Sequence, residues 1–213
     1  MDASLKSLEL DGQVQHFSPE MKFGEISEEI KTKLGATRVL TEIRLDGKSV
    51  DLEEEEVLNT KSFKDLGNIV FKTRRIDELF RESLLLAPKI CEALRMDCGD
   101  VDGFLAKGEV REAHQRVSEM TSLMEWLLQL IAGMQSLGND KLEDIQFTQG
   151  KVMDSVNRMQ TLLASLHVHL AGEKWNEFRA VLQGDFFNEV GVWQILFEDV
   201  SKTWNPKSSL LDS

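Results

Sequence analysis

The chain has 213 residues, of which 41% are apolar, and it carries a formal net charge of −12. A chain of this length and apolar content folds around one large core or two small ones. The negative charge argues against nucleic acid or an anionic membrane as partners, because both require clustered Lys and Arg. No stretch approaches the roughly 18 apolar residues of a membrane span, and the start "MDASLKSLEL" is not typical of a secretory signal. We therefore expect a cytoplasmic protein.

The first part of the chain, residues 1–74, has the period of two that is typical of strands. Two Asp-Gly pairs, Asp11-Gly12 and Asp46-Gly47, lie between alternating apolar residues. Both residue types tolerate positive φ, so each pair predicts a tight hairpin turn. A last apolar strand is expected at Asn68–Lys72.

One helix is expected between the two hairpins. Apolar residues recur at helical spacing from Phe23 to Leu34, Ser18 and Pro19 fit the start of a helix, and Gly35 fits its C-cap. The segment 52–67 reads as a polar loop that contains four consecutive acids, Glu53–Glu56. This acidic run is interpreted either as a docking patch or as a solvated loop.

The resulting order is strand, strand, helix, strand, short strand, strand. This order, with the stretches "LTEIRLDGKSVD" and "FKDLGNIVFKTRR", resembles the β-grasp fold of ubiquitin-like domains. Ubiquitin-like modifiers end in a free Gly-Gly tail, whereas this chain continues through Arg74-Arg75-Ile76 into a helical pattern. The resemblance therefore implies a built-in recognition module rather than a conjugated modifier.

From Arg75 onward the apolar period is helical. The expected helices run from Ile76 to a break at Asp97–Gly103, and over Val110–Met134, Leu142–Leu170 and Glu173–Trp204. Pro88 is expected to bend the first, and Gly184-Asp185 to interrupt the last, with Asp185 as the N-cap of its second half. The sequence thus predicts an α+β protein: a β-grasp domain over 1–74, an antiparallel four-helix bundle over 75–205 and a flexible tail over 206–213.

The reactive side chains form no pattern that indicates chemistry. His167 and His169 are two residues apart, so on a helix they point in different directions and cannot share a metal ion. Cys91 and Cys98 are about two helical turns apart, too far for a disulfide. Signatures of nucleophilic catalysis and of phosphate loops are absent. We expect no enzyme activity, no cofactor and no metal.

A partner surface is better indicated, because methionine and tryptophan concentrate in the helical region. Methionine adapts to varied partners and tryptophan anchors interfaces. The last helix carries more apolar surface than one stripe needs, so it either lies centrally in the bundle or meets another chain. The candidate partner-binding residues are four apolar anchors and two adaptable methionines: Trp126, Trp193, Phe197, Trp204, Met120 and Met124. The alternative is that these side chains form the core.

The segment "KGEVREAHQRVSEMTSLMEWLLQLI" and the acidic, Met-bearing bundle are similar to bacterial helical export chaperones, those for flagellin among them. This resemblance implies a protein that holds the amphipathic segment of another protein. We therefore expect a non-enzymatic, protein-binding adaptor or chaperone-like factor. Two alternatives stay open: a structural homo-oligomer, and a small helical metal protein or enzyme that uses Asp185, Glu189 and a histidine.

Overall fold

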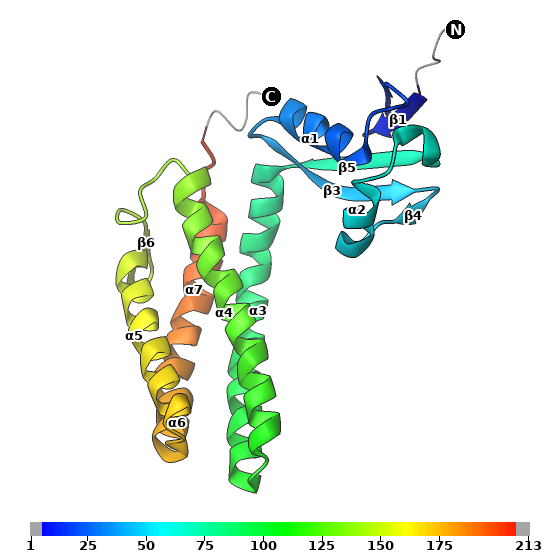
Figure 1. The fold of residues 1–213 in the computed structure, drawn as a ribbon. Coiled ribbons are helices and arrows are strands. Elements are labelled where there is room, and N and C mark those ends of the chain that lie inside the picture. Colours follow the sequence, from blue (N-terminus) through cyan, green and yellow to red (C-terminus); the bar gives the residue numbers. More distant parts are fainter. Residues whose placement is uncertain (1–5, 208–213) are drawn as a thin grey trace, which may run out of the picture. The chain divides into compact units, whose positions relative to one another are not determined.

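The computed structural model describes residues 6–207 and has an α+β fold, with a five-stranded mixed sheet followed by a helical region (Figure 1). The chain divides between Leu79 and Phe80 into two compact units. We call residues 6–79 the sheet unit and residues 80–207 the helical unit. Each unit has its own hydrophobic core.

The sheet unit is a mixed sheet in the order β2-β1-β5-β3-β4. Its strands are β1 (Lys6–Leu10), β2 (Gln13–Phe17), β3 (Arg38–Leu45), β4 (Lys48–Ser49) and β5 (Ile69–Arg75). Strands β1 and β5 are parallel, and the other neighbouring pairs are antiparallel. Helix α1 (Phe23–Leu34) buries its apolar side in the core of this unit, where the rings of Phe23 and Phe71 stack with their centroids 5.8 Å apart.

Both Asp-Gly turns secure the same strand, β5. The two aspartates, Asp11 and Asp46, have positive φ values of 50° and 51°, as the hairpin prediction requires. The carboxylate of Asp11 accepts the backbone N–H of Thr73 at 2.7 Å, and that of Asp46 accepts the backbone N–H of Asn68 at 2.7 Å. Because Asn68 precedes β5 and Thr73 lies near its end, the repeated turn holds the strand at two separate points.

The polar loop predicted for 52–67 is wrong in its first half. Residues Leu52–Leu58 form helix α2, which carries the acidic run Glu53–Glu56. The Asp51 carboxylate accepts the N–H of Glu54 at 2.8 Å, and the Glu54 carboxylate accepts the N–H of Asp51 at 3.2 Å. This reciprocal capping box satisfies two donors that would otherwise be unpaired at the start of a helix.

Helix α1 begins later than predicted. Its first residue is Phe23, and Ser18 and Pro19 lie in the turn that precedes it. The predicted C-cap at Gly35 is confirmed, since this glycine has a φ of 63°.

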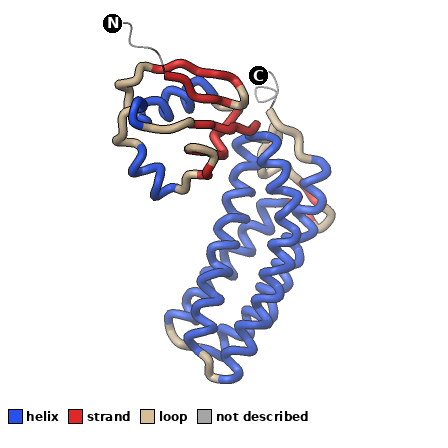
Figure 2. The backbone as a smooth tube through the Cα atoms, turned by 90° about the vertical axis from the view of Figure 1, so that its right-hand side faces the viewer, coloured by secondary structure: helices blue, strands red, loops and turns tan. Residues whose placement is uncertain are grey.

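The helical unit consists of long helices that run side by side (Figure 2). They are α3 (Ile76–Lys107), α4 (Val110–Leu137), α5 (Val152–Ala171), α6 (Trp175–Val181) and α7 (Phe187–Thr203), with a π-helical turn at Leu182–Phe186 between α6 and α7. A small hairpin, β6 (Gln146–Phe147) with β7 (Gly150–Lys151), precedes α5. All five helices and the π turn contribute to one continuous core.

The predicted break at Asp97–Gly103 is wrong, because α3 continues to Lys107 and ends before Gly108, which has a φ of 77°. Cys98 and Val101, within the expected break, are fully buried in the core. The Asp and Gly residues of this segment are exposed or only half-buried, so burial of the apolar positions maintains the helix there. Pro88 also lies inside α3, which continues through it.

Two further helix boundaries differ from the prediction. The third helix begins at Val152 rather than Leu142, because the intervening residues form a loop and the β6–β7 hairpin, with Gly150 at a φ of 136°. Asp185 is not an N-cap, since it lies inside the π turn and makes no capping hydrogen bond there. The helix is thus widened at this point, not restarted.

The prediction of a flexible tail over 206–213 is wrong for its first two residues, Pro206 and Lys207, which are fixed to the end of α4. Pro206 is buried, and its carbonyl accepts a hydrogen bond from the side-chain amide of Asn139 at 2.8 Å. The N–H of Lys207 donates to the carbonyl of Leu137 at 2.9 Å. Residues 208–213 lie outside the described part of the chain.

Candidate functional site

Three of the four expected anchors belong to the core of the helical unit. Trp193 and Phe197 have no exposed surface, and their rings pack edge to face with centroids 6.0 Å apart. Trp204 is 8% exposed and packs on Phe80, with 4.8 Å between the ring centroids. Trp126 is half-buried and packs against the same core. Helix α7 is therefore rich in apolar residues because it lies centrally in this unit.

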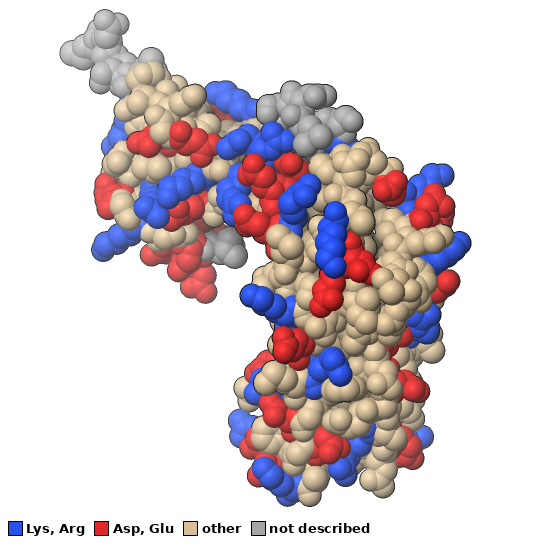
Figure 3. Space-filling view, turned by 180° about the vertical axis from the view of Figure 1, so that it is seen from behind, with Lys and Arg blue, Asp and Glu red and all other residues tan. Residues whose placement is uncertain are grey.

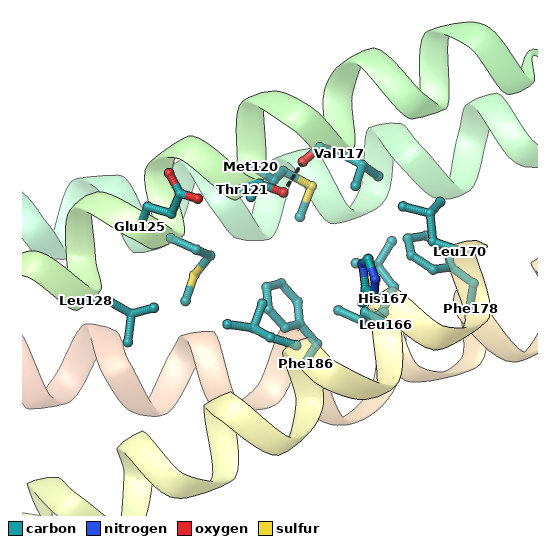
Figure 4. A pocket seen from close by; sticks show the side chains of 13 residues that line it. Val117, Met120, Thr121, Glu125, Leu128, Leu166, His167, Leu170, Phe178 and Phe186 are labelled. Carbon is teal, nitrogen blue, oxygen red and sulfur yellow. Dashed lines mark hydrogen bonds between the residues drawn. The ribbon is translucent and has the colours of Figure 1, made fainter. Parts of the chain in front are cut away.

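The two expected wall residues, Met120 and Met124, lie in a different setting. They line an apolar groove between α4 and α5 with a volume of about 350 Å³ (Figure 4). This volume is at the lower end of the range for ligand sites in proteins. Four half-buried apolar side chains form the mouth of the groove: Val117 and Leu128 from α4, and Leu163 and Leu170 from α5.

Helix α6 and the π turn together form the floor of this groove. Phe178, Leu182 and Phe186 all line the groove and are each 1% exposed. These residues are four apart, and in a regular α-helix each such step rotates a side chain about 40° further round the axis. A π turn contains more residues per turn, which reduces this drift. The three side chains can therefore share one face and close the groove from below.

Few polar groups reach the groove. Glu125 on the α4 side and His167 on the α5 side are both exposed, and Figure 4 shows them on opposite walls. The hydroxyl of Thr121 donates to the carbonyl of Val117 at 2.9 Å within α4, so it is already satisfied. An apolar cleft with a small number of polar groups at its rim is typical of a binding site.

The acid pair of the enzyme alternative lies elsewhere, in a shallow polar cleft between α5 and the last helical stretch. Glu189 is 6% exposed and accepts hydrogen bonds from the Ser155 hydroxyl and from Arg158, whose Nε lies 2.9 Å from its Oε2. Asp185 lines the same cleft and is exposed. Because Glu189 is ion-paired and hydrogen-bonded, its environment supports a structural carboxylate rather than a general base.

The described histidines and cysteines are not arranged in a way that supports metal binding or nucleophilic catalysis. Within residues 6–207, no cluster of His, Cys, Asp and Glu side chains could hold a metal ion. His167 is exposed whereas His169 is half-buried, so they occupy different environments. Burial raises the pKa of Cys91 and of Cys98 to about 12, which leaves both thiols protonated at neutral pH.

Charged residues of both signs are interspersed over the face of the molecule that Figure 3 shows. None of the described helices combines the length and the apolar content needed to cross a bilayer. Comparison with protein-family models, with curated proteins and with solved structures yields no match for this chain. Inference about its function therefore rests on the geometry of the chain itself.

Sequence reasoning found two residues of the groove and missed most of the others. The sequence places the α5 residues Leu163, Leu166 and Leu170 only within an expected helix, and it predicts an interruption at Gly184-Asp185 where the structure has the π turn. One signal was present: Phe178, Leu182, Phe186 and Val190 recur every four residues without the usual step of three. Such a run indicates a widened turn, because a regular helix would carry the stripe off one face.

Proposed function

We propose that the helical unit binds a partner protein by holding an amphipathic helix in the groove between α4 and α5. The observation that carries this proposal is the elongated apolar groove itself, which has half-buried apolar side chains at its mouth and a floor shaped by the π turn. Helix-in-groove recognition uses partner side chains at helical spacing that enter such a cleft. No catalytic group is required for this role.

The methionines of the wall support binding rather than simple core packing. Met120 and Met124 are buried, yet both border the groove, so their unbranched side chains can change rotamer as a partner enters. The apolar surface that the partner covers contributes about 25 cal/mol per Å² to the free energy of binding, before the costs of association are subtracted. A groove of this size therefore suits a moderate and reversible affinity.

We propose further that the helical unit is a four-helix bundle in which α6, the π turn and α7 count as one helix. The sheet unit would then be a ubiquitin-like β-grasp module attached before it. The strand order β2-β1-β5-β3-β4, with α1 packed on the core of the sheet, supports this assignment. Together these assignments favour an adaptor or chaperone-like role over an enzyme.

A matched pair of crosslinking positions tests the groove. Thr121 and Ser122 are adjacent and exposed on α4, but of the two only Thr121 lines the groove. A photoreactive residue at position 121 should give a discrete protein adduct in an extract of the native cells, and the same residue at position 122 should give little or none. Equal adduct patterns at both positions would contradict the proposal.

One observation favours the alternative of a structural homo-oligomer. Leu85 and Met96 on α3 are 59% and 70% exposed, and their spacing of eleven residues places them on one side of the helix. Multi-angle light scattering decides between the two functions: a stable dimer that Met96→Glu dissociates would favour self-association. Helix α7 does not offer this surface, because its large apolar side chains are buried within the chain or packed against its own core.

A further inference from the structure

The groove contains one formally charged residue, Glu125. Its side chain is exposed, and within residues 6–207 no side chain forms an ion pair or hydrogen bond with it. Arg116 of α4 forms ion pairs with Asp97 at 3.3 Å and with Glu119 at 3.1 Å, but none of these residues lines the groove. The rim thus carries an unneutralised negative charge on one wall, in a protein whose net charge is −12.

The groove also has a defined length. On α4 its lining residues recur at helical spacing from Val117 to Leu128, which at a rise of about 1.5 Å per residue corresponds to about 16 Å. On α5 they recur at helical spacing from Leu163 to Leu170, which corresponds to about 10 Å or two turns. A third helix about three turns long can therefore lie along the α4 wall and contact α5 over about two of those turns, because the side chains of all three helices recur at the same spacing.

We infer that the occupant of the groove is a basic amphipathic helix of at least three turns, with a Lys or Arg placed opposite Glu125. This inference rests on the proposed function and specifies its partner. The apolar stripe of the partner fills the space above Met120, Met124 and the π turn, and its basic flank neutralises the rim. Because the charge pair is at an exposed rim, it contributes more to selectivity and to the association rate than to total affinity.

The test uses two synthetic helical peptides of 14 residues with identical Leu stripes, one with Lys and the other with Glu at every polar position. Fluorescence anisotropy gives the Kd of each peptide for the full chain at low and at moderate salt. We expect the Lys peptide to bind at least tenfold more tightly than the Glu peptide, with a smaller difference at higher salt.

Two neutralising variants separate local pairing from net charge. Glu125→Gln removes the charge at the rim, and Glu112→Gln removes an exposed charge from the first turn of α4, outside the groove. Glu125→Gln should weaken the Lys peptide about two- to fivefold, as for a typical exposed ion pair, and Glu112→Gln should weaken it less than twofold. Equal effects of the two variants, or equal affinities of the two peptides, would overturn the inference.

A groove-filled variant distinguishes failure of this inference from failure of the proposed function. Thr121→Phe places a ring in the groove and should abolish binding of either peptide, while Ser122→Phe should leave it intact. If both peptides bind equally and Thr121→Phe blocks both, the groove binds helices without a basic preference. If neither peptide binds the native chain, or Thr121→Phe changes nothing, helix binding at this groove is itself wrong.

Discussion

Filling the groove should stabilise the free protein. Thr121 is exposed, lines the groove and uses its hydroxyl only for the hydrogen bond to Val117 within the same helix. A phenylalanine at this position can lay its ring between the two walls, over Met124 and Leu166, which line the groove on α4 and α5. The substitution therefore covers apolar surface that water reaches in the native chain.

The magnitude follows from area. A phenylalanine side chain buries about 150–250 Å², and we take about 100 Å² as the part that the groove covers. At about 25 cal/mol per Å² this burial contributes about 2.5 kcal/mol, from which the loss of side-chain freedom subtracts about 1 kcal/mol. Thr121→Phe should therefore increase the free energy of unfolding by roughly 1–2 kcal/mol.

Urea denaturation followed by far-ultraviolet circular dichroism measures this change, with Ser122→Phe as the control. Ser122 is exposed on the same helix and lies outside the groove lining, so a ring there remains in water. Its effect should stay within about 0.5 kcal/mol of the native value. A destabilised Thr121→Phe protein, or the same change at both positions, would show that no space for a ring exists between α4 and α5.

Three further predictions concern the supporting structure. Cys91 and Cys98 are fully buried with pKa values of about 12, so Ellman's reagent at pH 8 should label neither thiol in the native protein and both in guanidinium chloride. Burial tends to raise the pKa of Asp11, but hydrogen bonds from Thr73 and the charge of Arg38 hold it below its ordinary value of 3.8. Because this carboxylate stabilises the fold when ionised, Asp11→Asn should lower the free energy of unfolding by about 1 kcal/mol above pH 5, after allowance for the exposure of the side chain. The difference should vanish once the pH falls below the lowered pKa of Asp11. A constant difference from pH 6 to pH 2, measured by urea denaturation, would exclude the charge as its origin. Arg158→Met leaves the buried Glu189 carboxylate without its cation and should lower the free energy of unfolding by about 2 kcal/mol. This is less than for a fully buried pair, because Arg158 is half exposed. The double variant Arg158→Met/Glu189→Met should regain most of that stability, and thermal unfolding of the single and double variants tests both expectations.

The predictable parts of the fold are those that local chemistry decides. The two Asp-Gly turns and the C-cap at Gly35 were identified because positive φ selects these residue types at any position in a chain. The helical character of the chain from Ile76 onward was clear from the apolar period alone. None of these features depends on residues distant in the sequence.

The wrong break at Asp97–Gly103 and the misplaced start of α5 have a common physical cause, which is tertiary contact; helix α2, by contrast, was missed although its capping box is local. The segment Asp97–Gly103 contains residues that disfavour a helix, yet Cys98 and Val101 are held in the core by the other helices. The start of α5 was misplaced because Leu142 is buried like a core residue although it lies in a loop. Apolar spacing indicates which side chains are buried, but it does not show whether those residues lie in a helix, a strand or a loop.

The candidate site was only partly predictable for the same reason. Met120 and Met124 were singled out for their side-chain chemistry, and they do border the groove. Trp193 and Phe197 are predicted as anchors from the excess apolar surface of the last helix, but large aromatic residues occupy cores as readily as interfaces, and both are buried. The groove itself lies between two helices, and the distance between them depends on packing across the whole unit, which no single segment of the sequence determines.

The widened turn at Leu182–Phe186 holds one residue more than a regular helical turn. Because the extra residue is taken up there, the residues before the turn face the groove while those after it stay packed in the core. Deleting Gly184 would remove the extra residue and restore uniform winding, while α6 and α7 keep their phase relative to each other. Phe178 would then stay beneath the cleft, whereas a deletion inside α4 or α5, which have no such turn, would rotate the residues beyond it by about 100°.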